Sequence, residues 1–404
     1  MREKLVIVGN GMAAGRMLEH LSSLAPDTYD VTLFGAEPRG NYNRILLSPL
    51  LAGQEALEQI VIHDADWYAA HNIACRFGET VTRIDRAAKT VRSRNGETPY
   101  DRLVIATGSA PFLIPVAGRD LQGVVTFRDL DDVNTMVAAS AKPGLKVVVI
   151  GGGLLGLEAA AALRRRGADV TVLHLMGHLM ELQLDPAASR LLQQTLERRG
   201  IKVHCRAQTT AILGHRRVEA VLLDDGTVYP ADLVVMATGI RPETRLATDA
   251  RLHVERGIVV DDCMRTSDAN IFAIGECVQH DDICYGFVAP LYEMAEVAAH
   301  TLAGQSAAFR PAQNATSLKV TGIGLFSVGE FNGGEGTESI LLSDPGIGLY
   351  RKLVIRDGRL AGALLFGDTG DGPWYLDLIR SGVPVETIRD DLAFGRAAAE
   401  RLAA

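Results

Sequence analysis

The sequence predicts an α/β fold with two doubly wound parallel sheets and a small α+β domain towards the C-terminus. The first observation is a strand, a glycine turn, a helix and a second strand over residues 4–34. The second is the same order of elements over residues 145–173. This unit builds doubly wound sheets, so its repetition predicts two Rossmann-like domains. The third is a change past residue 315 to short alternating runs, which are typical of antiparallel strands.

The individual elements follow from apolar runs and glycine positions. Buried parallel strands are expected at 4–8, 30–34, 102–106, 145–150, 168–173, 232–237 and 271–274, and helices at 12–24 and 151–166. Three of these strands end just before Gly108, Gly239 and Gly275, where a ligand can approach the backbone. Near the end, Asp357-Gly358 signals a hairpin, and helices are expected near 371–382 and 390–403.

The composition excludes several classes of protein. The chain has 404 residues, 47% apolar and 22% charged, which is globular rather than disordered. Its net charge of −8, without a basic block, argues against nucleic-acid binding. Five scattered cysteines predict neither a disulfide framework nor a CxxC metal site. We expect no membrane span and no signal segment, and therefore a cytoplasmic protein.

The first glycine loop runs from Gly9 to Ala14. Gly9 makes the tight turn, Gly11 admits a pyrophosphate to the backbone, and Ala14 is small enough for helix–strand packing. Met12 and Ala13 open the helix whose N–H groups and dipole attract phosphates. The loop and its context predict a dinucleotide site.

An acid is expected at the end of the next strand, where it holds a ribose. Glu37 is the nearest acid to that position. The alternative is that Glu37 is a solvated turn residue before Pro38.

The second loop has all three glycines of the motif. They are Gly151, Gly153 and Gly156, with Leu154, Leu155 and Glu158 on the helix that follows. The next strand ends in His174, where an acid would select the 2′-hydroxyl of NAD. No Arg follows closely to hold a 2′-phosphate, so NADH and NADPH both stay open, and His174 either contacts the ribose or only caps the strand.

Two dinucleotide folds in one chain suggest one for FAD and one for NAD(P)H. The triads Ala106-Thr107-Gly108 and Ala237-Thr238-Gly239, with the later run Ile274-Gly275-Glu276-Cys277, resemble the pyridine-nucleotide-disulfide-oxidoreductase-like flavoproteins. The resemblance implies a discontinuous FAD domain at 1–112 and 240–314, an inserted NAD(P) domain at 113–239 and a C-terminal α+β domain at 315–404. It also implies cofactor contacts at Arg44, Ser48, Val81, Ala106, Thr107, Gly108, Arg128, Thr238, Gly239, Gly275, Glu276, Pro290 and Leu291.

A narrower resemblance covers essentially the whole chain. The runs 42–48, 149–160, 180–185, 273–277, 288–292 and 366–369 are similar to those of assimilatory nitrite reductase large subunits and of the flavoprotein subunit of assimilatory nitrate reductase. The resemblance implies hydride transfer from NAD(P)H to FAD, which needs orientation rather than a catalytic acid or base. We therefore expect no catalytic side chain.

Some positions depart from the family pattern. Glu276 replaces an Asp, and Ser48 falls near the place where thiol-dependent relatives carry a redox Cys. Ferredoxin reductase relatives usually have Ser-Lys where this chain has Ser48-Pro49. A thiol relay is therefore not expected. Nor is a metal site, because Gly177 argues against a helix that would bring together His174 and His178.

The expected function is an FAD-dependent NAD(P)H oxidoreductase. Nitrite reductase large subunits continue into iron–sulfur and sirohaem modules, which these residues do not contain. We expect electrons to pass to a separate iron–sulfur protein or to a nitrate reductase catalytic subunit, and no nitrite reduction by the chain alone. The alternatives are a rubredoxin or ferredoxin reductase of another pathway and a non-catalytic FAD-binding protein. A homodimer is also left open.

Overall fold

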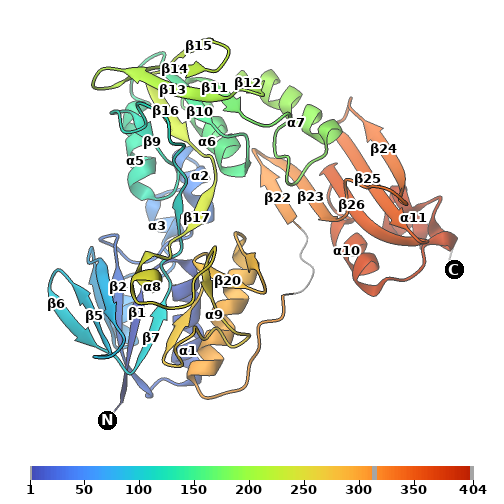
Figure 1. The fold of residues 1–404 in the computed structure, drawn as a ribbon. Helices are drawn as coiled ribbons and strands as arrows, with labels where there is room; N and C mark the ends of the chain where they lie inside the picture. Colours follow the sequence, from blue (N-terminus) through green and yellow to red (C-terminus); the bar gives the residue numbers. More distant parts are fainter. Residues whose placement is uncertain (1, 312–315, 401–404) are drawn as a thin grey trace. The chain divides into compact units, whose positions relative to one another are not determined.

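The computed structural model describes residues 2–311 and 316–400 (Figure 1). It divides the chain into two compact units, Met1–Phe112 with Ile240–Pro311, and Leu113–Gly239 with Ala312–Ala404. The further division of the second unit into a nucleotide-binding domain and a C-terminal domain stays a prediction. No helix of the described residues is long and apolar enough to cross a membrane.

A five-stranded parallel sheet forms the centre of the first unit. Its order is β19-β7-β1-β2-β3, with bounds Ile271–Ala273, Arg102–Ile105, Glu3–Val8, Tyr29–Gly35 and Ile73–Phe77. The centres of these strands are apolar, as expected for a sheet covered on both faces, and Leu5, Ile7 and Val104 are fully buried. Helices α1 (Met12–Leu24) and α9 (Val288–Leu302) lie side by side against this core (Figure 1).

Smaller elements complete the first unit. An antiparallel sheet contains β4 (Val81–Asp85), β5 (Thr90–Ser93) and β6 (Gly96–Pro99). The short helices are η1 (Arg44–Leu46), α2 (Leu47–Leu51), α3 (Leu57–Ile60), α4 (Ala65–Ala70) and α8 (Arg245–Asp249). The short strands are β8 (Ser109–Pro111), β17 (Ile240–Pro242), β18 (Ile258–Val259), β20 (Val278–His280) and β21 (Ile283–Cys284).

The second unit begins with another parallel sheet. Its order is β12-β11-β10-β16-β9, with bounds Ile201–Cys205, Asp169–His174, Lys146–Ile150, Leu233–Met236 and Val124–Val125. Its helices are α5 (Leu130–Ala139), α6 (Leu154–Arg165) and α7 (Pro186–Arg198). Strands β13 (Thr209–Gly214), β14 (Val218–Leu223) and β15 (Val228–Pro230) form an antiparallel sheet. Both predicted doubly wound sheets are therefore present.

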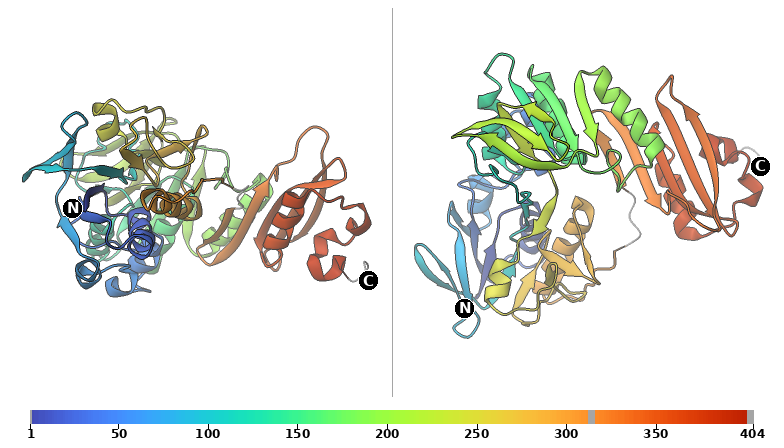
Figure 2. Two further views of the ribbon diagram at one scale, coloured as in Figure 1. Left: turned by 90° about the horizontal axis from the view of Figure 1, so that it is seen from below. Right: turned by 45° about the horizontal axis from the view of Figure 1, so that its top comes forward.

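An antiparallel sheet with helices follows in the second unit, as the alternating runs predict (Figure 2). Its order is β22-β23-β26-β25-β24, with bounds Thr316–Val320, Ile323–Gly329, Arg359–Gly367, Leu349–Arg356 and Glu338–Asp344. The hairpin at Asp357-Gly358 is confirmed, and both residues have positive φ, 49° and 69°. Helix α10 (Gly372–Ser381) packs on this sheet.

The predicted helix at 390–403 is confirmed only over Arg396–Ala399, and the continuous helix expected from residue 390 is wrong. Residues 386–400 instead form η2 (Glu386–Ile388), η3 (Leu392–Phe394) and α11 (Arg396–Ala399). Gly395 interrupts the chain with φ of 90°, and the Asp371 carboxylate fills the space of a side chain there. Residues 401–404 of the predicted helix lie outside the described residues.

Candidate functional site

The first glycine loop follows β1 at the carboxyl end of the sheet. Gly9 has φ of +111°, and a Cβ on it would lie 2.1 Å from the carbonyl oxygen of Ala106. Any side chain at this position therefore collides with the backbone of the first Ala-Thr-Gly triad. The glycine turn after β1 therefore packs directly on the triad that follows the neighbouring strand β7.

The next glycine of this loop faces open space. A Cβ on Gly11 would meet no atom within 4 Å, and the φ of this residue is −83°, which any residue adopts. Gly11 is the N-cap of α1, and no side chain caps that helix. The first N–H groups of a helix lack partners within the helix and attract anions. The open cradle beside Met12 and Ala13 fits a pyrophosphate, while Ala14 is fully buried against the core.

Glu37 lies two residues beyond β2 and is held by two side chains. Its carboxylate accepts hydrogen bonds from the hydroxyl of Tyr42 at 2.8 Å and from Nη2 of Arg44 at 2.5 Å. The structure therefore brings together Glu37 and Arg44, two residues predicted separately as cofactor contacts. These bonds orient the carboxylate at a strand end, which is the place of a ribose-binding acid.

Other predicted residues lie at neighbouring strand ends of the same sheet or in the first turn of α9. Gly275 follows β19 with φ of +87°, and a Cβ on it would lie 3.3 Å from Cβ of Ala13 in the first turn of α1. Glu276 accepts a hydrogen bond from Oγ of Ser109 at 2.7 Å. Thr107 donates through Oγ1 to the carbonyl of Glu243 at 2.7 Å. Gly108 follows Thr107, and Pro290 and Leu291 lie in the first turn of α9.

Three predicted residues lie in other elements. Ser48 is part of α2, and Val81 is buried on β4 opposite Ser93. Arg128 belongs to the second unit, where its backbone N–H donates to Oδ2 of Asp132 at 2.7 Å. Cofactor contacts at these positions rest on the resemblance alone.

The second glycine loop repeats the construction of the first. Gly151 has φ of +122°, and a Cβ on it would lie 2.1 Å from the carbonyl oxygen of Ala237. A Cβ on Gly156 would lie 2.1 Å from the carbonyl oxygen of Gly151, so helix α6 packs tightly on the loop. Gly153, the N-cap of α6, faces open space like Gly11.

The other predicted residues of this second loop lie on α6 or follow β16. Leu154 and Leu155 open α6, and Leu155 is partly exposed. Glu158 lies in the next turn of the same helix. Thr238 and Gly239 follow β16, and Gly239 has φ of +108° with open space around it.

His174 ends β11, as predicted, but its ring is buried. Its Nδ1 accepts a hydrogen bond from the Gly152 backbone at 3.0 Å, and its Nε2 lies 3.0 Å from Oε2 of Glu181. His178 instead bonds the carbonyl of Leu184 through Nε2 at 3.1 Å. The two rings therefore have different partners.

One group within the described ranges has the composition of a cation site. It consists of Asp262, His280 and Asp281. The Asp262 carboxylate lies 2.9 Å from Nε2 of the histidine, and that of Asp281 lies 3.6 Å from Nδ1. The carboxylates thus face different nitrogens of one ring, and of these nitrogens only Nε2 has a hydrogen-bond partner in the part of the chain that the structure describes.

The cysteines are not arranged for a thiol relay. All five are free. Burial raises the pKa of Cys75 to about 11 and also raises the pKa of the fully buried Cys277. Thiols with raised pKa values are poor nucleophiles at neutral pH.

Several side chains at these sites were not predicted from the sequence. The Tyr68 hydroxyl donates to Oδ1 of Asn10, inside the first loop, at 2.9 Å. Ser109 and Tyr42 bond the predicted acids, and Glu181 bonds His174. Tyr42 and Glu181 lie within runs that carried the resemblance, and Ser109 directly follows a triad. No sequence signal points to Tyr68, which is 58 residues from its partner.

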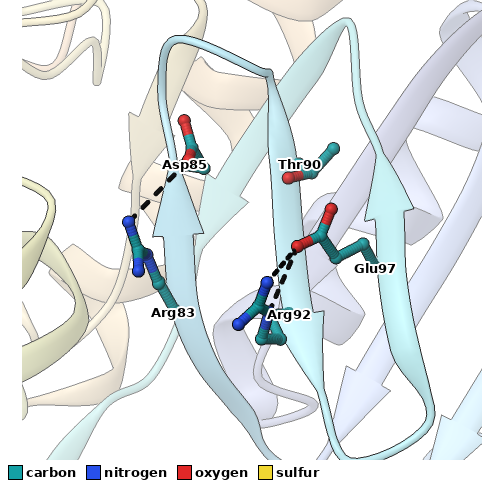
Figure 3. Close-up of a pocket in the computed structure, with 5 residues that line it drawn as sticks. All are labelled: Arg83, Asp85, Thr90, Arg92 and Glu97. Carbon is teal, nitrogen blue, oxygen red and sulfur yellow. Dashed lines mark hydrogen bonds and ion pairs between the residues drawn. The ribbon is translucent and has the colours of Figure 1, made fainter.

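A pocket on the sheet β4-β5-β6 is lined by Arg83, Asp85, Thr90, Arg92 and Glu97 (Figure 3). Arg92 binds Glu97 at 2.5 Å, and Arg83 lies 3.8 Å from Asp85 (Figure 3). Its charges are paired with each other, and none of its residues belongs to either glycine loop. We assign it no function.

Comparison with known families agrees with this geometry. Residues 3–317 match the family described as pyridine nucleotide-disulphide oxidoreductase. The chain belongs to this family. Residues 315–383 match the rubredoxin NAD+ reductase C-terminal domain. The resemblance inferred from the glycine loops and triads is thereby confirmed, and the chain is a member of an oxidoreductase family.

Curated relatives include proteins of nitrogen metabolism. The chain is 47% identical over 381 residues to a nitrite reductase [NAD(P)H] of Bacillus subtilis, covering 94% of this chain and 47% of that protein. It is 40% identical over 378 residues to the assimilatory nitrate reductase electron transfer subunit of the same species, covering 93% of this chain and 49% of that protein. The chain thus spans about half the length of the curated relatives it matches.

Solved structures share the whole fold. The covalent putidaredoxin reductase–putidaredoxin complex matches with a TM-score of 0.87 and 27% identity, over 99% of this chain and 98% of that chain. NADH:rubredoxin oxidoreductase from Clostridium acetobutylicum matches with a TM-score of 0.82 and 25% identity, over 96% and 97%.

Proposed function

We propose that the chain is an FAD-dependent NAD(P)H oxidoreductase that delivers electrons to an iron–sulfur acceptor in nitrate or nitrite assimilation. The observation that carries the proposal is the pair of glycine loops, each with one glycine packed on an Ala-Thr-Gly triad and another facing open space. Each dinucleotide needs a tight turn after the strand and room for its pyrophosphate beside the backbone, and each loop supplies both. The 47% and 40% identities to nitrite and nitrate reductase proteins support the metabolic assignment.

We assign FAD to the first loop. Gly11 leaves room for the pyrophosphate, the start of α1 supplies N–H donors, and Glu37, held beyond the end of β2 by Tyr42 and Arg44, would bind a ribose. When bound, FAD supplies hydride acceptance and electron release. The protein's part is to bind and orient, since no side chain is required as acid or base in hydride transfer.

We assign the pyridine nucleotide to the second loop. Gly153 leaves room for its pyrophosphate, and the uncapped start of α6 supplies N–H donors. The carboxyl ends of β10, β11 and β16 surround this position, as in doubly wound folds that bind dinucleotides.

The electron acceptor lies outside these 404 residues in this proposal. Their five cysteines are scattered and free, so they do not supply the closely spaced thiolates of an iron–sulfur cluster. A second candidate function is rubredoxin reduction, favoured by the C-terminal family match and by the similarity to an NADH:rubredoxin oxidoreductase.

The proposal is tested by steady-state assays of the purified, FAD-loaded chain. We expect NAD(P)H-dependent reduction of ferricyanide, lost in Gly153→Val and retained in Glu219→Gln, an exposed surface change on β14. Rubredoxin and an iron–sulfur nitrite or nitrate reductase module are then compared as acceptors. Failure to reduce any acceptor despite full FAD loading contradicts the proposal, and a preference for rubredoxin favours the second candidate.

A further inference from the structure

The end of strand β11 lacks the acid that commonly selects NAD, but a carboxylate from another position reaches it. His174 occupies the strand end, and its Nε2 lies 3.0 Å from Oε2 of Glu181. The side chain of Glu181 is 28% exposed, whereas that of His174 is 8% exposed. The acid, rather than the histidine, is therefore the group accessible to a ligand.

The second glycine loop fixes this arrangement. The N–H of Gly152 donates to Nδ1 of His174 at 3.0 Å, and its carbonyl accepts from the N–H of Met180 at 3.1 Å. A Cβ on Gly152 would lie 2.6 Å from Cδ2 of Leu179, so the returning chain packs directly on the loop. Glu181 follows Met180 and is thereby attached to the loop on which we place the pyrophosphate.

The hydrogen bonds also determine the charge of the pair. Because a backbone N–H donates to Nδ1, the ring proton of His174 is on Nε2, where it donates to Glu181. The histidine is neutral in this arrangement, and the pair carries one negative charge. Oε1 of Glu181 forms no hydrogen bond within the part of the chain that the structure describes.

We propose that Glu181, positioned by His174, accepts a hydrogen bond from the 2′-hydroxyl of the adenosine ribose and thereby selects NADH over NADPH. The inference rests on the proposed function of the second loop. A carboxylate bonds a 2′-hydroxyl and repels a 2′-phosphate, so its charge discriminates between the two nucleotides. The choice between NADH and NADPH, which the sequence leaves open, is thus assigned to Glu181, seven positions beyond His174 at the strand end.

Arg206 lies near the same segment, and its positive charge would favour NADPH rather than NADH. Arg206 is exposed, its N–H donates to the carbonyl of Met176 at 3.0 Å, and a Cβ on Gly177 would lie 3.7 Å from its Nε. An Arg in this place would favour a 2′-phosphate. We give the deciding role to Glu181 because it is the charge bonded to the strand-end residue.

The experiment compares Glu181→Gln, Arg206→Ala and the control Glu219→Gln, which removes an exposed carboxylate elsewhere in the same unit. The glutamine retains an oxygen that can accept from His174. We expect the unmodified protein to prefer NADH. In Glu181→Gln, the NADH-to-NADPH ratio of kcat/KM should fall by about fivefold, the upper end of the scale for one partly exposed charge contact.

Calorimetric titration of the oxidised protein with NAD+ and NADP+ gives a readout independent of turnover. Tighter NADP+ binding by Glu181→Gln supports the inference. An unmodified protein that prefers NADPH contradicts it, as does a ratio that changes in Arg206→Ala but not in Glu181→Gln. If neither NADH nor NADPH is oxidised at all, the proposed function itself fails, whereas oxidation of both with an unaltered ratio overturns this inference alone.

Discussion

At the scale of single residues, the glycines of each loop have different physical roles. Gly9 and Gly151 have positive φ and collide with a triad carbonyl if a Cβ is added, whereas Gly11 and Gly153 meet nothing. The motif spelling predicts all four, but only the structure separates the glycines that the fold requires from those whose space is left for a ligand.

We predict that one substitution in the first loop lowers stability and that another removes the flavin without affecting folding. Gly9→Ala places a Cβ 2.1 Å from a backbone oxygen at φ of +111°, and should lower the free energy of unfolding by about 3 kcal/mol or more. Gly11→Val should fold normally but purify without flavin, because its side chain fills the cradle for the pyrophosphate. Thermal unfolding and the ratio of bound flavin to protein measure the two effects. Gly11→Val with a full complement of FAD contradicts the assignment of this loop.

The position of His174 at a strand end was predictable from the sequence, but its hydrogen-bond partners were not. The strand was predicted to end at this residue, and it does. Its partners depend on the chain returning from Leu179 to Glu181 against Gly152, which no periodicity or spacing indicates. The same is true of Tyr68, which reaches Asn10 from a separate helix.

At the scale of elements, the central strands of the two parallel sheets were predictable because each is a short apolar run, and several end just before a glycine. The outer strands β3, β9 and β12 and the helices α5, α7 and α9 were not predicted. Helix α1 has the predicted bounds, and α6 begins three residues later than expected, because residues 151–153 form the loop. The final helix was only partly predictable. Its alanine-rich residues do form α11, but Gly395, with φ of 90° and the Asp371 carboxylate beside it, separates α11 from η3, so no continuous helix begins at residue 390.

Asp185 gives a prediction at this scale, since it joins two elements of the second unit. Its Oδ1 caps α7 by accepting from the N–H groups of Ala187 and Ala188, and its Oδ2 accepts from the Tyr350 hydroxyl of β25 at 2.6 Å. Asp185→Ala removes the helix cap, which costs about 1 kcal/mol of stability. It also leaves the buried Tyr350 hydroxyl without its partner, which costs about 1–3 kcal/mol.

We therefore expect Asp185→Ala to lower the stability of the second unit by about 2–4 kcal/mol, and Tyr350→Phe to lower it by less. Asp224→Ala, in an exposed turn after β14, is the matched control. Chemical unfolding monitored by circular dichroism measures all three. Equal stability of Asp185→Ala and the control would show that this contact does not hold α7 to the sheet.

At the scale of the whole molecule, the chain combines two dinucleotide loops with cysteines that are free and scattered. We predict that these 404 residues reduce ferricyanide with NADH and do not reduce nitrite or nitrate until an iron–sulfur module is supplied. Measuring the reduction products of nitrite and nitrate with and without that module shows whether the module is required. Nitrite or nitrate turnover by these residues alone contradicts the prediction.

The central claim is that a pyridine nucleotide on the second loop reduces FAD on the first. Anaerobic titration of the FAD-loaded protein with NADH, followed through the flavin absorbance, tests it most directly. We predict prompt bleaching at one NADH per flavin and, in Gly153→Val, retained flavin that NADH does not bleach. Flavin that stays oxidised in the unmodified protein with excess NADH and NADPH contradicts the claim and leaves a protein that binds FAD without turnover.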